Sequence, residues 1–384
     1  MSVPVVLRIW SRAVIVPAWR RAAAVWVGCG IGGGIIFGPT GMHPHDLTQL
    51  ALGVPVVGAM LAITWLLVFV PTARVIVRAD AASYLRSLPG PRTSPIVVGA
   101  LALLGLQLPW LALWIAGDGL RGLAIVVGLT CLVALVASWR PRIRRAVFPH
   151  WTRGGQALRG VYVRALTRRA SDALIRGVGL AILAGLVAAL VVRNNALAGR
   201  DAAVLGSAVI AILLIPGVAG ALLPLFEAHR QCGWLASSLG MSAGARVVVL
   251  ATVVAGVYVV CALVAVAGAA LAFGWILDSA GGAAASIAAT VAWIGGVTVA
   301  TAIGSSMIAT RALIRAATSR GDRDASLARE GSDDRDERGA AVRVVVGAVV
   351  ASAFAVLCIG WLGIAGVGAL AALGASAIMT ARPS

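Results

Sequence analysis

The stretch 247–274 reads VVVLATVVAGVYVVCALVAVAGAALAFG and contains no charged residue. A helix needs about 20 mostly apolar residues to cross the hydrocarbon core of a membrane, and this stretch exceeds that length. It therefore predicts a membrane-spanning helix. The same criterion, applied outward from it, gives ten candidate spans, near 22–38, 50–71, 95–117, 122–139, 177–192, 202–226, 247–274, 284–308, 344–360 and 362–379.

The composition of the whole chain agrees with this reading. Of its 384 residues, 60% are hydrophobic and only 12% are charged. Soluble domains are about 45–50% apolar and about 25% charged. A soluble globule of this length has too little interior to bury the excess apolar surface, so we predict an all-α, polytopic integral membrane protein. Pro55, Pro109 and Pro216 are expected to kink the spans that contain them.

All 32 basic residues are arginines, which leaves the chain without a lysine and with a net charge of +18. A Walker A loop needs a lysine for the nucleotide phosphates, and a Schiff-base enzyme needs a lysine amine. ATP can therefore drive this chain only through another polypeptide that hydrolyses it. Membrane orientation and contact with anionic lipid explain the positive charge, which disfavours nucleic-acid binding as its purpose.

The distribution of the arginines predicts the orientation of the chain. Cytoplasmic loops next to spans carry an excess of basic residues. If the N-terminus is cytoplasmic and ten spans alternate, only Arg121, Arg193 and Arg200 lie outside. We therefore predict a multi-pass protein of the cytoplasmic (inner) membrane with both termini in the cytoplasm. The external loops are then short, near 39–49, 118–121, 193–201 and 275–283.

Two parts of the chain share one order of elements, which predicts a duplication. The first membrane unit, 1–150, and the second, 151–317, each begin with an amphipathic cytoplasmic helix whose arginines lie four residues apart, and four spans follow. An even number of spans gives both units the same orientation, as parallel repeats. A chance resemblance between arginine-rich helices is the alternative. A charged cytoplasmic linker, 318–340, and a two-helix C-terminal hairpin, 341–384, complete the chain.

Each unit also contains a short cytoplasmic helix between its second and third spans. The first reads ASYLRSLP at 82–89, and the second reads GWLASSLG at 233–240. Apolar residues recur on one face of each helix, and a helix breaker, Pro89 or Gly240, ends it. A short helix held between two spans can transmit a rigid-body movement if its apolar side chains fill a groove on a partner.

This order of parts resembles the permease subunit of an ATP-binding-cassette (ABC) exporter. Those permeases begin with an amphipathic elbow helix, and a short coupling helix follows two spans later. The phrases LRSLP at 85–89 and SSLGMS at 237–242 are similar to the coupling-helix phrases of that family. The resemblance implies a separate ATPase subunit into which the coupling helices dock through Tyr84, Leu85, Leu88, Trp234, Leu235 and Leu239.

The chain also departs from the family pattern. Such permeases commonly have fewer spans per chain and pair as dimers. Two coupling helices in one chain would let a single polypeptide engage two ATPase copies. A homodimer and a single-chain arrangement both remain open at this point.

No catalytic, cofactor-binding or metal-binding residue is predicted. The acidic run 333–337 lies inside a mixed-charge linker and has no second cluster to face, so a solvated linker is favoured. The residues 43–46, His-Pro-His-Asp, offer at most three ligands and are interpreted as a polar external loop. Span interiors carry essentially no carboxylate or histidine, and Gln107 is the most polar side chain at depth. Ion-coupled transport and acid–base catalysis are therefore disfavoured.

These observations favour a permease subunit that moves an amphipathic or apolar substrate across the membrane with a separate ATPase. The alternative is a multi-pass membrane scaffold that transports nothing and recruits cytoplasmic partners. A lipid-modifying enzyme and a secondary transporter are the remaining hypotheses, and both lack the polar residues that their chemistry needs.

Overall fold

The computed structural model describes residues 3–37, 42–80, 93–139, 154–195, 197, 199–278 and 284–324, together with the single residue 366. The described elements are all helices, and no strand occurs among them. The predicted short helix at 82–89, the linker beyond residue 324 and the C-terminal hairpin lie outside the described residues, apart from that single position.

Five described helices are long and apolar enough to cross a membrane. They are α4 (Pro55–Arg78), α6 (Leu108–Ser138), α8 (Ser171–Asn194), α11 (Ala243–Asp278) and α12 (Ala284–Asp324). A sixth, α9 (Gly199–Gln231), qualifies if its two parts, which are bent by 48° between Ile215 and Gly217, form one span. This architecture fits a polytopic membrane protein.

The first 34 described residues form one continuous rod rather than an interfacial helix followed by a separate span. Helix α1 (Val3–Trp10) passes through a π-helical turn (Ser11–Ile15) into α2 (Val16–Ile36). Pro17 follows the π-helical turn without ending the helix. Its buried side chains recur every three or four positions and so form one stripe that packs in part on α4. The stripe consists of Trp10, Val14, Ala18, Ala22 and Val25.

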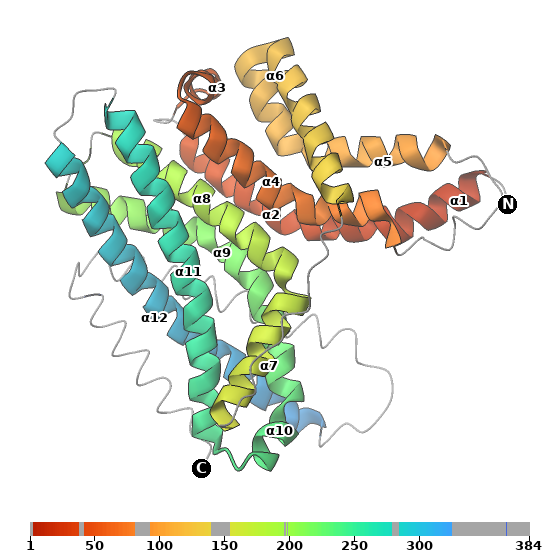
Figure 1. Ribbon diagram of the computed structural model, residues 1–384, viewed down its shortest axis with the longest axis vertical. Coiled ribbons are helices and arrows are strands. Elements are labelled where there is room, and N and C mark those ends of the chain that lie inside the picture. The colour runs from red at the N-terminus through yellow and green to blue at the C-terminus, as the bar shows by residue number, and fades with distance from the viewer. Residues whose placement is uncertain are drawn as a thin grey trace.

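The predicted span 95–117 is wrong as a single helix. Helix α5 (Thr93–Leu106) ends before Gln107, and α6 runs in a different direction from it (Figure 1). Pro109 explains the break, because it has no N–H to donate to the carbonyl of Gly105. Helix α6 breaks again at Asp118 and at Gly119, whose φ is 55°, as the predicted loop at 118–121 requires. Its two arms lie side by side in Figure 1.

The other two prolines expected to kink spans have different positions. Pro55 begins α4, because Val54 is extended with φ −111° and ψ 102°, so the expected kink inside a 50–71 span is wrong. Pro216 lies between the two parts of α9, where the helix bends by 48°. The kink expected at Pro216 is confirmed, and its cause is the missing backbone N–H of proline.

Residues 44–49, predicted as part of an external loop, instead begin helix α3 (Pro44–Gly53). The helix has a strong start signal: proline at its first position and a capping carboxylate, since the His43 N–H donates to Asp46 Oδ2 at 3.2 Å. His45 Nδ1 lies 2.7 Å from the carbonyl oxygen of Gly117, which ties α3 to the turn of α6. The histidine therefore has a structural partner.

Helix α8 lies at the centre of the bundle, in contact with α4, α9 and α11, and α12 covers α9 and α11 (Figure 1). Small residues allow these close approaches. Gly185 of α8 packs directly on the backbone of α11 at Ala265, and Gly177 of α8 packs on Gly217 of α9. At these points a side chain would occupy space that the neighbouring backbone fills.

Gly185→Ala should therefore destabilise the protein, although alanine is the better helix former. Its Cβ would lie 2.7 Å from the backbone nitrogen of Ala269, so the helices must separate. We expect the free energy of unfolding to fall by about 1–3 kcal/mol. Gly256→Ala in α11 is the matched control, because no atom lies within 4 Å of its Cβ position. Gly256→Ala should raise the free energy of unfolding by up to about 1 kcal/mol. Thermal unfolding in mild detergent measures both, and a shift of the same sign in both variants would contradict this packing.

Candidate partner-docking helix and apolar cavity

Helix α10 (Gly233–Ser238) lies between the ends of α9 and α11, at the position where the sequence predicts a short helix. Gly240 ends it with a φ of 64°, a conformation that glycine adopts without strain. The Gly240 N–H donates to the carbonyl of Ser237, and the Met241 N–H donates to that of Ala236, each at 3.0 Å. This is a Schellman motif, which satisfies the last carbonyls of the helix.

Two of the three described coupling-helix residues reach the surface. Trp234 is 73% exposed and Leu239 is 38% exposed, whereas Leu235 is half-buried. Ala236 faces inward and is buried. Tyr84, Leu85 and Leu88 lie outside the described residues. An exposed indole can fill an apolar pocket on a partner.

A buried polar cluster beneath α10 joins three other helices. The hydroxyl of Tyr162, on α7 (Gly154–Arg169), is hydrogen-bonded to His229 Nδ1 of α9 at 2.8 Å. Arg246 of α11 donates from Nη2 to the backbone carbonyl of His229. Burial raises the pKa of Tyr162 to about 12, and the positive charge of Arg246 opposes that rise. The hydroxyl therefore keeps its proton at neutral pH and can donate it to a hydrogen bond.

The same cluster supports α10 itself. The Cβ position of Gly233, the first residue of α10, is 3.4 Å from Arg246 Nη1. The guanidinium of Arg246, which is bonded to the His229 carbonyl of α9, thus lies near the start of α10, and α7 packs against α9, α10 and α11. Helix α7 thus links α10 to α9 and α11. Neither Tyr162 nor His229 was predicted from the sequence as part of a site.

Arginine side chains occur on α4, α7, α8, α9 and α11 towards the end of the bundle that carries α10. We call this region the basic end; it carries Arg74, Arg169, Arg176, Arg230 and Arg246. Ion pairs join its elements: Arg74 Nη1 lies 3.9 Å from Asp172 Oδ1, and Arg169 Nη1 lies 3.4 Å from Glu227 Oε1. These ion pairs link α4 to α8 and α7 to α9.

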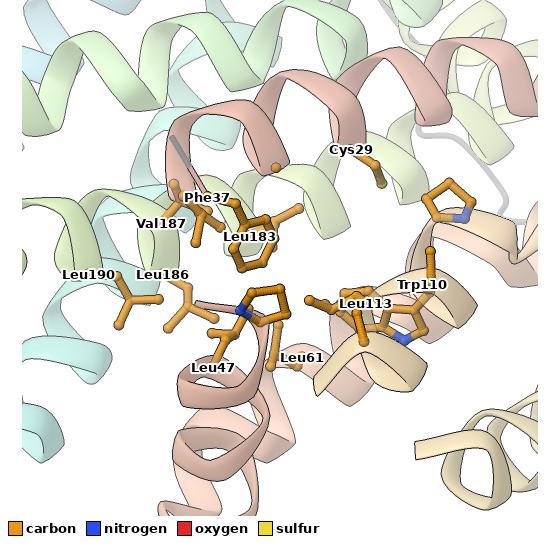
Figure 2. A pocket seen from close by; sticks show the side chains of 16 residues that line it. Cys29, Phe37, Leu47, Leu61, Trp110, Leu113, Leu183, Leu186, Val187 and Leu190 are labelled. Carbon is orange, nitrogen blue, oxygen red and sulfur yellow. The ribbon is translucent and has the colours of Figure 1, made fainter. Parts of the chain in front are cut away.

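An apolar cavity of about 320 Å³ lies among α2, α3, α4, α6 and α8, towards the other end of the bundle (Figure 2). The described residues of its walls include no carboxylate, histidine or arginine. The volume lies at the lower end of the range for small-molecule sites, about 300–1,000 Å³. The labelled lining side chains are Cys29, Phe37, Leu47, Leu61, Trp110, Leu113, Leu183, Leu186, Val187 and Leu190.

Polar chemistry is sparse elsewhere in the described part of the chain. No group of three or more histidine, cysteine, aspartate or glutamate residues there could hold a metal ion. Gln107 is buried at the α5–α6 break, where its amide nitrogen donates to the carbonyl of Leu103 at 3.2 Å. Its amide oxygen accepts a hydrogen bond from Thr130 at 3.1 Å. Gln107 therefore links α5 to the second arm of α6.

No known protein family, curated protein or solved structure matches this chain. The geometry alone therefore carries the functional argument. The described residues are helical and fit a polytopic membrane protein, with an exposed tryptophan on the short helix α10 at one end and an apolar cavity towards the other.

Proposed function

We propose that this chain is the permease component of an ABC-type exporter, driven by a separate ATP-hydrolysing subunit that docks on α10. The observation that carries the proposal is the exposure of Trp234, at 73%, on a short helix that lies between α9 and α11 in the chain. A docking helix must expose apolar anchors and must also be rigidly connected to the spans that it moves. Helix α10 exposes such an anchor, and it packs on α7 and α9.

The charge distribution supports a cytoplasmic location for the docking helix. Arginines cluster at the basic end around α10, whereas Arg121 and Arg193 belong to the opposite end. Under the positive-inside rule, the basic end faces the cytoplasm of the inner membrane, where ATP is available. In the full proposal the chain has ten spans in two parallel units, with cytoplasmic termini and a coupling helix in each unit.

The apolar cavity supports an apolar or amphipathic substrate. Its walls come from five helices, and α4 and α8 connect it to the basic end. Since α8 packs on α9 and α11, a displacement of those helices would change the packing of α8 at the cavity. Movement at α10 and a change of cavity shape are thus connected through packed helices.

Purification of the tagged full-length chain from native membranes in mild detergent, with mass spectrometry of the co-purifying proteins, tests the proposal. We expect a soluble ATPase subunit that contains a Walker A lysine, in stoichiometric amount. A preparation without any ATPase, under conditions in which other membrane complexes of the same cells stay intact, would overturn it.

A further inference from the structure

Helix α3 forms part of the wall of the apolar cavity, at the end of the bundle opposite to α10 (Figure 1). Pro44 and Leu47 of this helix line the cavity, and Figure 2 shows the Leu47 side chain among the other lining residues. Leu47 is only 3% exposed. The proposed function gives this helix no role.

The two faces of α3 differ in polarity. Leu47, Thr48 and Ala51 are buried, whereas His45, Asp46 and Gln49 are exposed. A short amphipathic helix of this kind packs its apolar face on the protein and keeps its polar face in water or among lipid headgroups. In the proposed orientation, that polar face is on the external side of the membrane. Helix α3 therefore lies between the apolar cavity and the external water.

The C-terminal part of α3 is anchored on α4. A Cβ at Gly58 of α4 would lie 2.5 Å from the carbonyl oxygen of Ala51, so the two backbones are in direct contact there. Val54, which is extended, is the single residue between the two helices. This end of α3 therefore follows α4.

The N-terminal part of α3 rests on the turn of α6 at Gly117. His45 donates from Nδ1 to the carbonyl of Gly117 at 2.7 Å, and a Cβ at Gly117 would lie 2.8 Å from the carbonyl oxygen of Pro44. Thr48 packs on Gly117 without a hydrogen bond to it, since its hydroxyl donates to the carbonyl of His45 at 2.9 Å. Ala116, the residue before Gly117, lines the cavity. The contact between α3 and α6 therefore lies at the edge of the cavity.

We propose that α3 is the gate of the apolar cavity and opens it to the side of the membrane opposite the basic end. In the open state, the N-terminal part of α3 moves away from Gly117 while Ala51 keeps its contact with Gly58, so Leu47 leaves the cavity wall. A lid that carries part of the wall controls the entry and release of the ligand. The direction rests on the proposed function, in which an apolar substrate leaves through this gate to the external side.

The rate at which a membrane-impermeant thiosulfonate modifies Cys29 tests the gate, because Cys29 lines the cavity and is a free thiol. The measurement uses intact spheroplasts and a parent variant in which the other four of the five cysteines are alanine. Gly117→Ala is expected to raise the rate about tenfold, since the added methyl group displaces α3 from α6. His45→Ala, which removes the hydrogen bond to Gly117 and adds no bulk, should raise it several-fold.

Two substitutions serve as matched controls. Gly128→Ala lies in the second arm of α6, and no atom lies within 4 Å of its Cβ position. Gln49→Ala removes an exposed side chain from the polar face of α3. Both should leave the rate of Cys29 modification within about twofold of the parent, as is usual for surface substitutions.

Three results would overturn the gate. The first is the parent rate in both Gly117→Ala and His45→Ala, and the second is an equal rise in Gly117→Ala and Gly128→Ala. The third is a rise that occurs only in inverted vesicles, where the reagent reaches the cytoplasmic side. His45→Ala keeps the test decisive if Gly117→Ala fails to fold. No ATPase takes part in this measurement, so the absence of an ATPase partner would overturn the proposed function without changing the outcome for the gate.

Discussion

Replacement of Trp234 by alanine is expected to weaken binding of the ATPase subunit by about 30-fold or more, because a central aromatic anchor contributes about 2 kcal/mol or more to an interface. Trp234 projects from α10 with 73% of its surface exposed, so its removal costs the free protein little packing. The measurement is an affinity titration of the purified ATPase subunit against the detergent-solubilised chain. Binding should weaken without a change in thermal stability.

Trp275→Ala is the matched control for this experiment. Trp275 belongs to the far end of α11 and is 54% exposed, so the same substitution removes a similar surface from the opposite end. Affinity for the ATPase should stay within about twofold of the wild type. If both variants bind the ATPase as tightly as the wild type does, α10 is not the docking helix. If both lose binding equally, the effect of Trp234→Ala is not specific to the interface.

The second large effect is expected at the apolar cavity. Gly33 of α2 lines it, and a Cβ at Gly33 would meet only the Phe37 side chain, at an ordinary contact distance of 3.8 Å. Leucine at this position therefore fits the backbone and projects into the cavity. We expect Gly33→Leu to lower photolabelling of the cavity wall by a diazirine-bearing fatty acid at least tenfold, since the leucine occupies space that the chain of the probe needs.

Gly30→Leu provides the control on the same helix. No atom lies within 4 Å of the Cβ position of Gly30, which is exposed and does not line the cavity. Both substitutions replace a helical glycine by a better helix former, so both variants should fold. Wild-type labelling of the cavity wall in Gly33→Leu would contradict the expectation that the chain of the probe occupies the space beside Gly33. Equal losses in both variants would show that the effect comes from the surface of α2.

Local sequence signals predicted the parts of this fold that depend on the length of apolar runs and on the position of helix breakers. Apolar runs of sufficient length gave α8, α11 and α12, and breakers gave the turn at Asp118–Gly119, the bend at Pro216 and the end of α10 at Gly240. The errors also lie at breakers. Pro109 separates α5 from α6 and Pro55 begins α4, where the length criterion alone predicted continuous spans.

The candidate sites were harder to predict because helices far apart in the sequence build them. Tyr162 and His229 are 67 residues apart and meet only because α7 packs on α9. The walls of the apolar cavity come from five helices, and each residue there is an ordinary apolar residue of its own helix. Hydrophobic periodicity shows which face of a helix is buried, but it does not identify the facing helix. Trp234 was predictable because the short helix that carries it, and the glycine that ends that helix, belong to one continuous segment of the sequence.

The most direct test of the proposed function is site-specific photo-crosslinking from α10 in native membranes. A photoreactive amino acid replaces Ser238, which is exposed four residues after Trp234, so the anchor itself stays intact. A second variant carries the same group at Trp275, at the far end of α11. We predict a crosslinked product from position 238 that contains a Walker A ATPase, and none from position 275. Crosslinking at position 238 only to lipid or to proteins without an ATP-binding site would contradict the account.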